Sequence, residues 1–250
     1  MLNKEISYHF GPAVFQGDVV SGIYFSNKKI SQSNLSNSNI NAGLGFNYYI
    51  NNIFCFKTNF NFLQLNGNDE WGKNFQRMLK FRTYLFDVSA IVEYNYMNRF
   101  LKNSIFSAST GIAIINFYPM GKYNGKWYSL QKTGTEGQGL KPGSKKYQPL
   151  ALSIPINVGY YFILNNRDKF GFEICFRKTF TDYIDDVSGQ YYDNNEILNK
   201  KGERAANLAD PRPVKAQAGT YRGNPGKKDN YTFVNFSYRR LLGVKYIIKY

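Results

Sequence analysis

Residues 84–96 read YLFDVSAIVEYNY, and this stretch decides the fold. Every second side chain from Tyr84 to Tyr96 is apolar or aromatic, whereas Asp87 and Glu93 fall on the opposite face. A period of two predicts a β-strand with one apolar and one polar face. Strands of soluble proteins average about five or six residues, and a strand that crosses a membrane needs about 9–11. The length of this run therefore favours a transmembrane strand.

Seven more stretches alternate in the same way. They lie near residues 5–15, 40–50, 54–62, 104–117, 150–162, 169–183 and 230–242. The connections between the eight predicted strands alternate strictly between long ones (residues 16–38, 66–82, 118–148 and 184–229) and short ones (residues 51–52, 98–103 and 165–168). Short periplasmic turns and long extracellular loops are typical of outer-membrane barrels. We therefore predict one domain over residues 1–250, an all-β, eight-stranded antiparallel transmembrane β-barrel with both termini in the periplasm.

Aromatic residues, which make up 18% of the chain, fall at the predicted strand ends. At the short-turn end they are Tyr48, Tyr49, Tyr94, Tyr96, Tyr160, Tyr161 and Phe162, and at the long-loop end Phe60, Phe62, Phe117, Tyr118, Phe180 and Tyr183. Aromatic rings favour the boundary between lipid and water, because one side stays apolar and the other wet. The two sets predict the two aromatic girdles of a membrane barrel.

Alternation alone also fits a soluble barrel of the lipocalin type or a β-sandwich. The second face of the strands distinguishes a membrane barrel from these soluble folds, because its side chains are small and polar, as at Gly43, Gly45, Ser89 and Ser107. Such residues fit a crowded, narrow lumen better than a solvent-exposed surface. The residues MLNKE at the start do not read as an apolar leader, so export to the outer membrane is inferred from the barrel pattern.

The composition limits the partners. No window approaches eighteen consecutive apolar residues, which excludes a membrane-spanning helix, and the formal net charge is +15. A basic chain favours nucleic acid, anionic lipid or an acidic protein surface. Loop 118–148 is rich in lysine and contains Trp127 and Tyr128, a combination also seen in nucleic-acid binding. On a cell surface, attraction to lipopolysaccharide phosphates is the better interpretation, and we expect no nucleic-acid partner.

The interior of an eight-stranded barrel is just wide enough to be filled by side chains, so we expect no conducting channel. Charged residues on the predicted lumen face should pair with one another, because an unpaired charge there is costly. They are Lys57, Asp87, Glu93, Glu173 and Arg177. Cys55 and Cys175 fall on opposite sides of the lumen, too far apart for a disulfide, so we predict two free thiols.

The sequence offers little for catalysis or metal binding. The single histidine, His9, falls in the middle of the first strand, where we expect a neighbouring carboxylate to hold it. It cannot reach a substrate at the rim as a general base, so we predict no enzyme activity and no cofactor. Asp182, Asp185 and Asp186 cluster where calcium could bind, but their spacing does not match the EF-hand loop. Pairing with Arg and Lys is the interpretation we prefer, and we predict no metal site.

The long loops contain several recognisable motifs. They are NGKWYSLQ (124–131), GTEGQG (134–139), RKTFTDYIDDVS (177–188), AANLAD (205–210), RGN (222–224), KKD (227–229) and GD (17–18). With these motifs the chain resembles the PorG family, small outer-membrane barrels of the type IX secretion system of Bacteroidetes, which is also tied to gliding motility. The resemblance extends from the first strand to about Gly243.

The resemblance implies a non-catalytic protein-transport role: a barrel that docks the periplasmic ring of the lipoprotein PorK and its partner PorN at the outer membrane. The motifs supply candidate interaction or lid residues, namely Asn124, Gly125, Trp127, Tyr128, Gly134, Thr135, Glu136, Gly137, Arg177, Thr179, Asp185 and Asp186. A periplasmic ring would instead meet the short turns, where Arg99, Lys102 and Arg167 are candidate contacts. The tail 244–250 continues beyond the last predicted strand.

Two other functions remain open at this point. The chain could be an independent surface barrel that binds an external ligand or lipopolysaccharide through its long loops. It could also be an enzyme acting at the barrel rim on lipid A or peptides. Loop 184–229 is long and rich in Pro and Gly, and a loop of this length in a compact protein is usually functional or disordered. It is a candidate for a lid over the barrel mouth.

Overall fold

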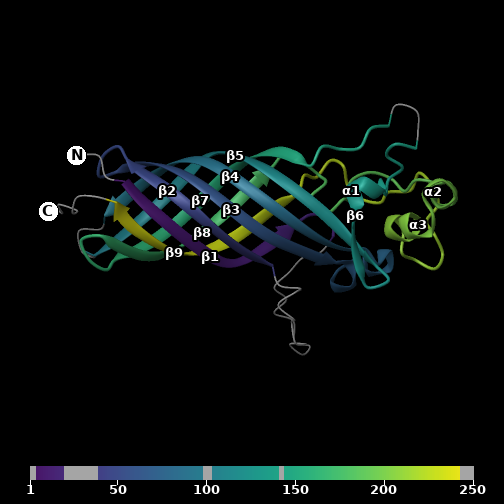
Figure 1. Ribbon diagram of the computed structural model, residues 1–250, viewed down its shortest axis with the longest axis horizontal. Helices are drawn as coiled ribbons and strands as arrows, with labels where there is room; N and C mark the ends of the chain where they lie inside the picture. Colours follow the sequence, from purple (N-terminus) through teal and green to yellow (C-terminus); the bar gives the residue numbers. More distant parts are fainter. Residues whose placement is uncertain (1–3, 20–38, 98–102, 141–143, 243–250) are drawn as a thin grey trace.

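The computed structural model describes residues 4–19, 39–97, 103–140 and 144–242. Eight long strands form the wall: β1 (Lys4–Gln16), β2 (Ile40–Tyr49), β3 (Phe54–Asn68), β4 (Lys80–Met97), β5 (Ser104–Tyr123), β7 (Leu150–Ile163), β8 (Asp168–Thr179) and β9 (Asn230–Leu242). Each strand pairs antiparallel with its neighbours, and β1 pairs with β9 to close the sheet. The predicted closed eight-stranded barrel is confirmed (Figure 1).

Large apolar side chains cover the outer face of the barrel. Every strand exposes them, for example Phe10, Leu44, Phe60, Val88, Ile112, Ile156, Ile174 and Phe236. A water-facing wall would not carry such a continuous apolar belt, whereas a lipid-facing wall requires one. The inner face is polar over the same height, so the soluble barrel and sandwich do not fit. Among the described residues no helix is both long and apolar enough to cross a membrane.

Several aromatic residues of the predicted girdles point elsewhere. Tyr94, Tyr96, Phe162, Phe60, Phe62, Tyr118 and Phe180 are exposed, as expected. Tyr161 and Phe117 are buried inside the barrel, and Tyr49 turns inward to donate to Glu5. The prediction was wrong at these three positions because neighbouring aromatic residues on one strand must face opposite sides of the sheet. Tyr183 lies beyond β8, where its ring stacks on Tyr147.

The wall is taller on one side than the sequence indicated. β3 and β4 stay paired as far as Asn68 and Lys80, so the predicted loop 66–82 shrinks to residues 69–79. β5 continues to Tyr123 and turns back through Asn124 and Gly125 into the short strand β6 (Lys126–Ser129). Both turn residues have positive φ, 47° and 80°, as a two-residue hairpin requires. β8, in contrast, ends at Thr179 and not near residue 183.

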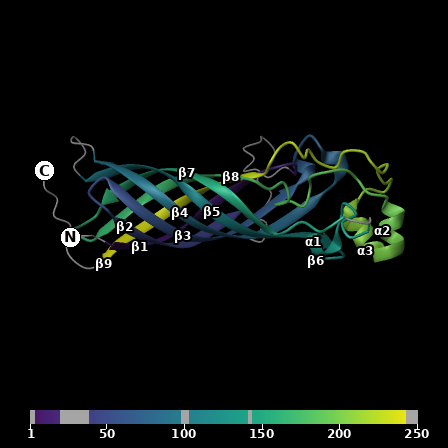
Figure 2. The same ribbon diagram turned by 90° about the horizontal axis from the view of Figure 1, so that it is seen from above.

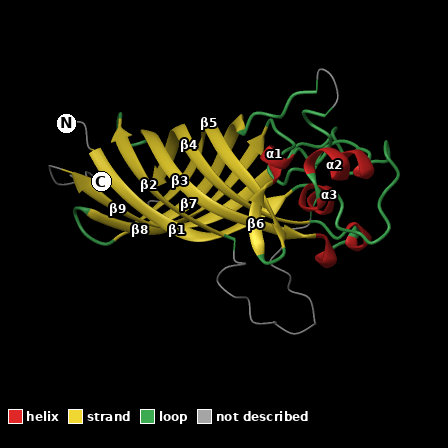
Figure 3. Cartoon of the chain, turned by 45° about the vertical axis from the view of Figure 1, so that its right-hand side comes forward, coloured by secondary structure: helices red, strands yellow, loops and turns green. Residues whose placement is uncertain are grey.

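The helices gather at one end of the barrel, opposite the end where β1 begins and β9 finishes (Figures 2 and 3). They are η2 (Asp69–Trp71), η3 (Phe75–Arg77), α1 (Leu130–Thr133), α2 (Asn194–Lys201) and α3 (Glu203–Ala209). We call the described parts of residues 69–79, 130–147 and 180–229 at this end the cap. α2 begins where the Asp193 carboxylate accepts from the amides of Asn195 and Glu196, and it ends at Gly202 with φ 82°.

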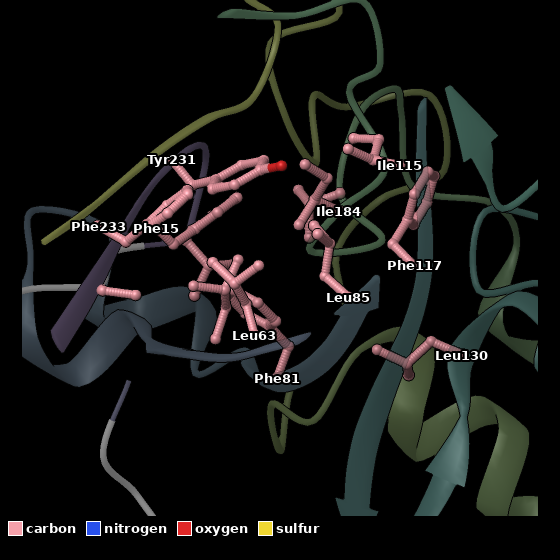
Figure 4. Packing of buried hydrophobic residues seen from close by; sticks show 14 of the residues in the cluster. Phe15, Leu63, Phe81, Leu85, Ile115, Phe117, Leu130, Ile184, Tyr231 and Phe233 are labelled. Atoms are coloured by element: carbon pink, nitrogen blue, oxygen red, sulfur yellow. The ribbon is translucent and has the colours of Figure 1, made fainter. Parts of the chain in front are cut away.

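An apolar cluster, which we call the plug, fills the barrel mouth beneath the cap (Figure 4). The barrel contributes Phe15, Leu63, Leu65, Phe81, Leu85, Ile115, Phe117, Tyr231 and Phe233, and the cap contributes Leu79, Leu130, Ile184, Val187 and Leu208. Most of these side chains are almost fully buried. The plug therefore joins cap and barrel by hydrophobic burial, the largest favourable contribution to folding.

Candidate functional site: the filled lumen and the cap

A charged network fills the lumen toward the end where the chain begins. Lys57 Nζ donates to Glu93 Oε2 at 2.8 Å and to Glu173 Oε1 at 2.7 Å. Arg239 donates hydrogen bonds to both carboxylate oxygens of Glu93, at 2.8 and 2.9 Å. All four side chains are at most 4% exposed. Each buried charge thus has a partner of opposite sign, which makes burial tolerable.

A second network occupies the middle of the lumen. Arg177 Nε donates to Asp87 Oδ2 at 2.7 Å, and the same oxygen accepts from Tyr231 Oη at 2.7 Å. His9 Nε2 lies 2.7 Å from Asn61 Oδ1, and Asn61 Nδ2 donates in turn to Asp87 Oδ1 at 3.2 Å. The prediction that a carboxylate holds His9 is therefore wrong, because the side-chain amide of Asn61 lies between the imidazole and Asp87.

The five lumen charges predicted to pair are confirmed as paired. Sequence reasoning missed Arg239 and the pair Lys169–Glu5, whose Nζ and Oε1 are 2.8 Å apart. Their strand parity is the signal that could have found them, because Arg239 shares the inward face with Asn235 and Ser237. The buried charges of the described lumen comprise four acidic and four basic residues, so the lumen is neutral overall. Cys55 and Cys175 are buried free thiols.

Motif residues from separate loops converge in the cap. Thr135 Oγ1 and Tyr147 Oη both donate to Asp186, the latter at 2.6 Å. Glu136 Oε1 accepts from the amides of Ser188 and Gly189 at 2.9 and 3.1 Å. These groups hold segment 130–147 against segment 180–189.

Arg222 completes this cluster from the far end of the last loop. Its Nη1 donates to Glu136 Oε1 at 3.1 Å and to the Asp186 carbonyl, and its Nη2 lies 3.6 Å from Asp186 Oδ2. Its Nε donates to the Ala209 carbonyl at 3.3 Å. Arg222 was not among the predicted site residues, although it lies in the RGN motif. The side chain is 1% exposed, so it ties segments together and does not face solvent.

Arg77 is the second tie of the cap. It pairs with Asp69 through two hydrogen bonds of 2.7 Å, and it donates to the backbone carbonyls of Asp18 at 2.7 Å and Arg222 at 2.5 Å. One side chain thus joins the first, second and last long loops. A guanidinium suits this task because its donors project in a fixed fork.

The remaining motif residues serve local structure. Asn124 and Gly125 form the hairpin turn, and the Arg82 and Arg204 guanidinium groups cover the rings of Trp127 (4.3 Å) and Tyr128 (4.6 Å). Gly134 and Gly137 adopt φ values of 68° and 79°, which favour glycine. Thr179 Oγ1 donates to the Asp229 carbonyl at the barrel rim, whereas Arg177 lies inside the lumen. The candidates therefore do not form one solvent-facing site.

Buried carboxylates connect the first loop with the cap. Asp185 accepts from the amides of Val19 and Val187, at 2.9 and 3.0 Å, and Asp229 accepts from the amide of Ile184 at 2.8 Å. Burial raises the pKa of the Asp185 carboxyl to about 8, and the charge of Asp18 adds to the shift. The pKa of Asp229 is raised well above its ordinary value by burial and by Asp185. No group of His, Cys, Asp and Glu side chains in the described segments is arranged to hold a metal ion.

The cap should be more stable in acid than in alkali. The raised pKa of Asp185 makes its contribution complete below about pH 4 and lost as pH rises through about 8. Corrected for intrinsic exchange, hydrogen-exchange protection of the Val19 and Val187 amides should fall by up to about tenfold per pH unit between about pH 4 and pH 8, and should level off above pH 8. Asp185→Asn should flatten this slope, and an unchanged slope in that variant would contradict the assignment.

Of the three predicted periplasmic contact residues, Arg167 is the one that the structure describes, and it lies at the end of the barrel away from the cap. Arg167 is exposed in the turn between β7 and β8, where Asn165 Oδ1 accepts from the amides of Arg167 and Asp168 at 2.8 and 3.0 Å. Arg240 is 54% exposed, with Nε 4.0 Å from Asp168 Oδ1. Arg99, Lys102 and the tail 244–250 lie outside the described residues.

The fold resembles solved outer-membrane proteins of bacteria. Neisserial surface protein A is 8% identical with a TM-score of 0.43, covering 95% of this chain and 96% of its own. Ail, the attachment invasion locus protein of Yersinia pestis, is 9% identical with a TM-score of 0.44, covering 97% and 100%. OprG of Pseudomonas aeruginosa is 10% identical with a TM-score of 0.43, covering 96% of each chain. No family model and no curated protein matches the sequence.

Proposed function

We propose that this chain is a non-catalytic outer-membrane barrel of the type IX secretion and gliding apparatus, which docks the periplasmic PorK/PorN ring. The observation that carries the docking role is the filled barrel. Paired charges occupy the lumen and the plug fills the mouth, so the protein acts through its surfaces and not by conduction. The secretion assignment rests on the resemblance of the loop motifs to the PorG family.

The convergence of those motifs supports the same proposal. Segments 134–139, 184–188 and 222–224 are far apart in the chain, yet Glu136, Asp186 and Arg222 meet in one buried cluster. Loops that served no purpose would not need a shared buried ion-pair cluster, which is costly to assemble. The single histidine is buried in the lumen against Asn61, away from any substrate at the rim. The exposed lysines at the cap end, such as Lys126 in β6 and Lys145 in the cap, favour contact with lipopolysaccharide phosphates.

In the proposed orientation the cap is extracellular and the short turns are periplasmic. The ring would then meet the end that carries Arg167 and Arg240. Both side chains are exposed and basic, so an acidic patch on the ring would be their counterpart. Surface pairs of this kind contribute mainly to partner choice and to the rate of association.

Reversing charge at this end should weaken ring attachment. The double variant Arg167→Glu, Arg240→Glu should lower the recovery of PorK and PorN by about tenfold or more, because like charges then face each other across the contact. The measurement is affinity purification from detergent-solubilised outer membranes, with the bound proteins quantified by mass spectrometry. Lys126→Glu, at the cap end, is the control and should recover both proteins as the wild type does. Equal recovery from the double variant would remove this end as the contact.

A further inference from the structure

Two hollows lie next to each other on the cap. One encloses about 630 Å³ and the other about 410 Å³, and Tyr191 and Tyr221 line both. Sites for small molecules have typical volumes of about 300–1,000 Å³ and combine aromatic walls with a few polar groups. The two hollows meet this description in size, and neither belongs to the lumen or to the turns that face the proposed ring.

Backbone hydrogen bonds join the two segments that line both hollows. Gln190 and Tyr221 form an antiparallel bridge. On either side, the Tyr191 amide donates to the Thr220 carbonyl at 2.9 Å, and the Gly219 amide donates to the Tyr191 carbonyl at 2.8 Å. Tyr221 therefore projects from a hydrogen-bonded pair of segments with its side chain 75% exposed. A tyrosine side chain has two χ angles, so it loses little conformational freedom when a ligand stacks on it.

The larger hollow combines aromatic faces with hydrogen-bonding groups. Two contacts hold Tyr192 in place. Its hydroxyl donates to Glu196 at 2.5 Å, and its ring packs against the backbone of Gly137, where a Cβ atom would clash with the ring. Gln190 and Asp193 line the same hollow and add an amide and a carboxylate. A sugar ring presents one apolar C–H face and an edge of hydroxyl groups, so it can stack on tyrosine while its hydroxyls bond to such side chains.

The smaller hollow is basic. Lys73, Arg77, Arg212 and Arg222 line it, against the single carboxylate of Asp18. Ion pairs with other residues hold the three arginines in place, and Lys73 is exposed at the surface of the cap. Lys73 and Arg212, whose side chain is 25% exposed, are the cations that a ligand can reach, whereas Arg77 and Arg222 are buried beneath them. A guanidinium beside a lysine favours a carboxylate, phosphate or sulfate group.

We propose that the paired hollows bind an acidic oligosaccharide that lies across Tyr221. A sugar stacks in the tyrosine-lined hollow, and the acidic substituent of its neighbour enters the basic hollow. The same chemistry occurs in the phosphorylated sugars of lipopolysaccharide and in external polysaccharides that contain uronic acids. The site does not depend on docking of the PorK/PorN ring, because it lies at the other end of the barrel.

Isothermal titration of the full-length barrel in detergent tests the site with three probes. They are a deacylated, phosphorylated lipopolysaccharide core oligosaccharide, an oligogalacturonate, and a neutral oligosaccharide of similar length. Tyr221→Ala should lower the affinity for the tighter-binding acidic probe by about tenfold, which is the contribution of a good aromatic stack. Lys73→Glu should weaken the acidic probes and leave the neutral one unchanged. The tighter acidic probe identifies the source of the ligand.

Phe75→Ala is the matched control, because Phe75 is 57% exposed on η3 of the same cap and lines neither hollow. It should bind every probe as the wild type does. The variants replace exposed side chains, and circular dichroism and heat-modifiable gel migration confirm that they fold. Absence of binding by both acidic probes, or an equal loss in Phe75→Ala, overturns the proposal. Binding of unrelated peptides in place of saccharides also overturns it. Ring recovery by Tyr221→Ala should equal that of the wild type, which separates this proposal from the docking role.

Discussion

Glu93→Leu should destabilise the folded barrel by about 3–5 kcal/mol, the typical cost of removing one partner of a buried ion pair. Glu93 is fully buried and accepts from Lys57 and twice from Arg239. Without Glu93, both cations depend on Glu173, whose Oε1 lies 2.7 Å from Lys57 Nζ and 3.7 Å from Arg239 Nη2. The measurement is urea-induced unfolding in detergent or lipid vesicles, followed by the gel shift between folded and heat-unfolded barrel.

The charge balance offers a sharp control. The double variant Glu93→Leu, Arg239→Met keeps the Lys57–Glu173 pair, so it should recover most of the stability that the single variant loses. Glu70→Leu removes a partner from the exposed pair with Lys80 and should cost at most about 1 kcal/mol. If the double variant is as unstable as Glu93→Leu, unpaired charge is not the cause.

Arg222→Met should unfold the cap while the barrel stays intact. The substitution leaves Glu136 and Asp186 buried without their cation, a loss of about 3–5 kcal/mol concentrated in the loops. Burial already raises the pKa of Asp186 to about 6 while Arg222 opposes the rise, so without the arginine this carboxyl should take up a proton more readily. The expected result is rapid proteolysis within residues 184–229 and an unchanged gel shift of the barrel.

Arg212→Met is the control for this experiment. Arg212 belongs to the same cap and pairs with Asp210 at 2.8 Å, but its side chain is 25% exposed. Water can therefore replace part of the lost interaction, and the cap should resist protease nearly as the wild type does. A protease-resistant cap in Arg222→Met would show that the plug alone holds it in place.

The strands were predictable because lipid imposes a strict rule on each of them. Side chains from Phe86 to Tyr94 must alternate between lipid and lumen, so the period of two is visible without any knowledge of partners. The rule ends where the strands leave the membrane. Asn66 and Asn68 continue β3 in water, and only their pairing with Arg82 and Lys80 shows that the strand goes on.

The cap was less predictable because its helices depend on tertiary contacts. α2 has a start signal in Asp193 and Glu196, which match the spacing of a capping box. Helices of eight and seven residues are marginal alone, so their formation depends on packing of Ile197 against Ala205 and Ala206. No sequence pattern announces which loop such short segments will pack against. The meeting of Glu136 with Arg222 is likewise fixed by the folded cap.

The neutral lumen has a consequence for how copies of this barrel share a membrane. The formal charge of the chain is +15, and the eight buried lumen charges cancel, so the excess lies outside the lumen. Exposed lysines of the cap project beyond the lipid belt, so two barrels that approach side by side repel each other through water. At low ionic strength the barrels should stay dispersed, and multivalent anions should draw them into clusters. The spacing of the molecules thus becomes a property set by the ions around them.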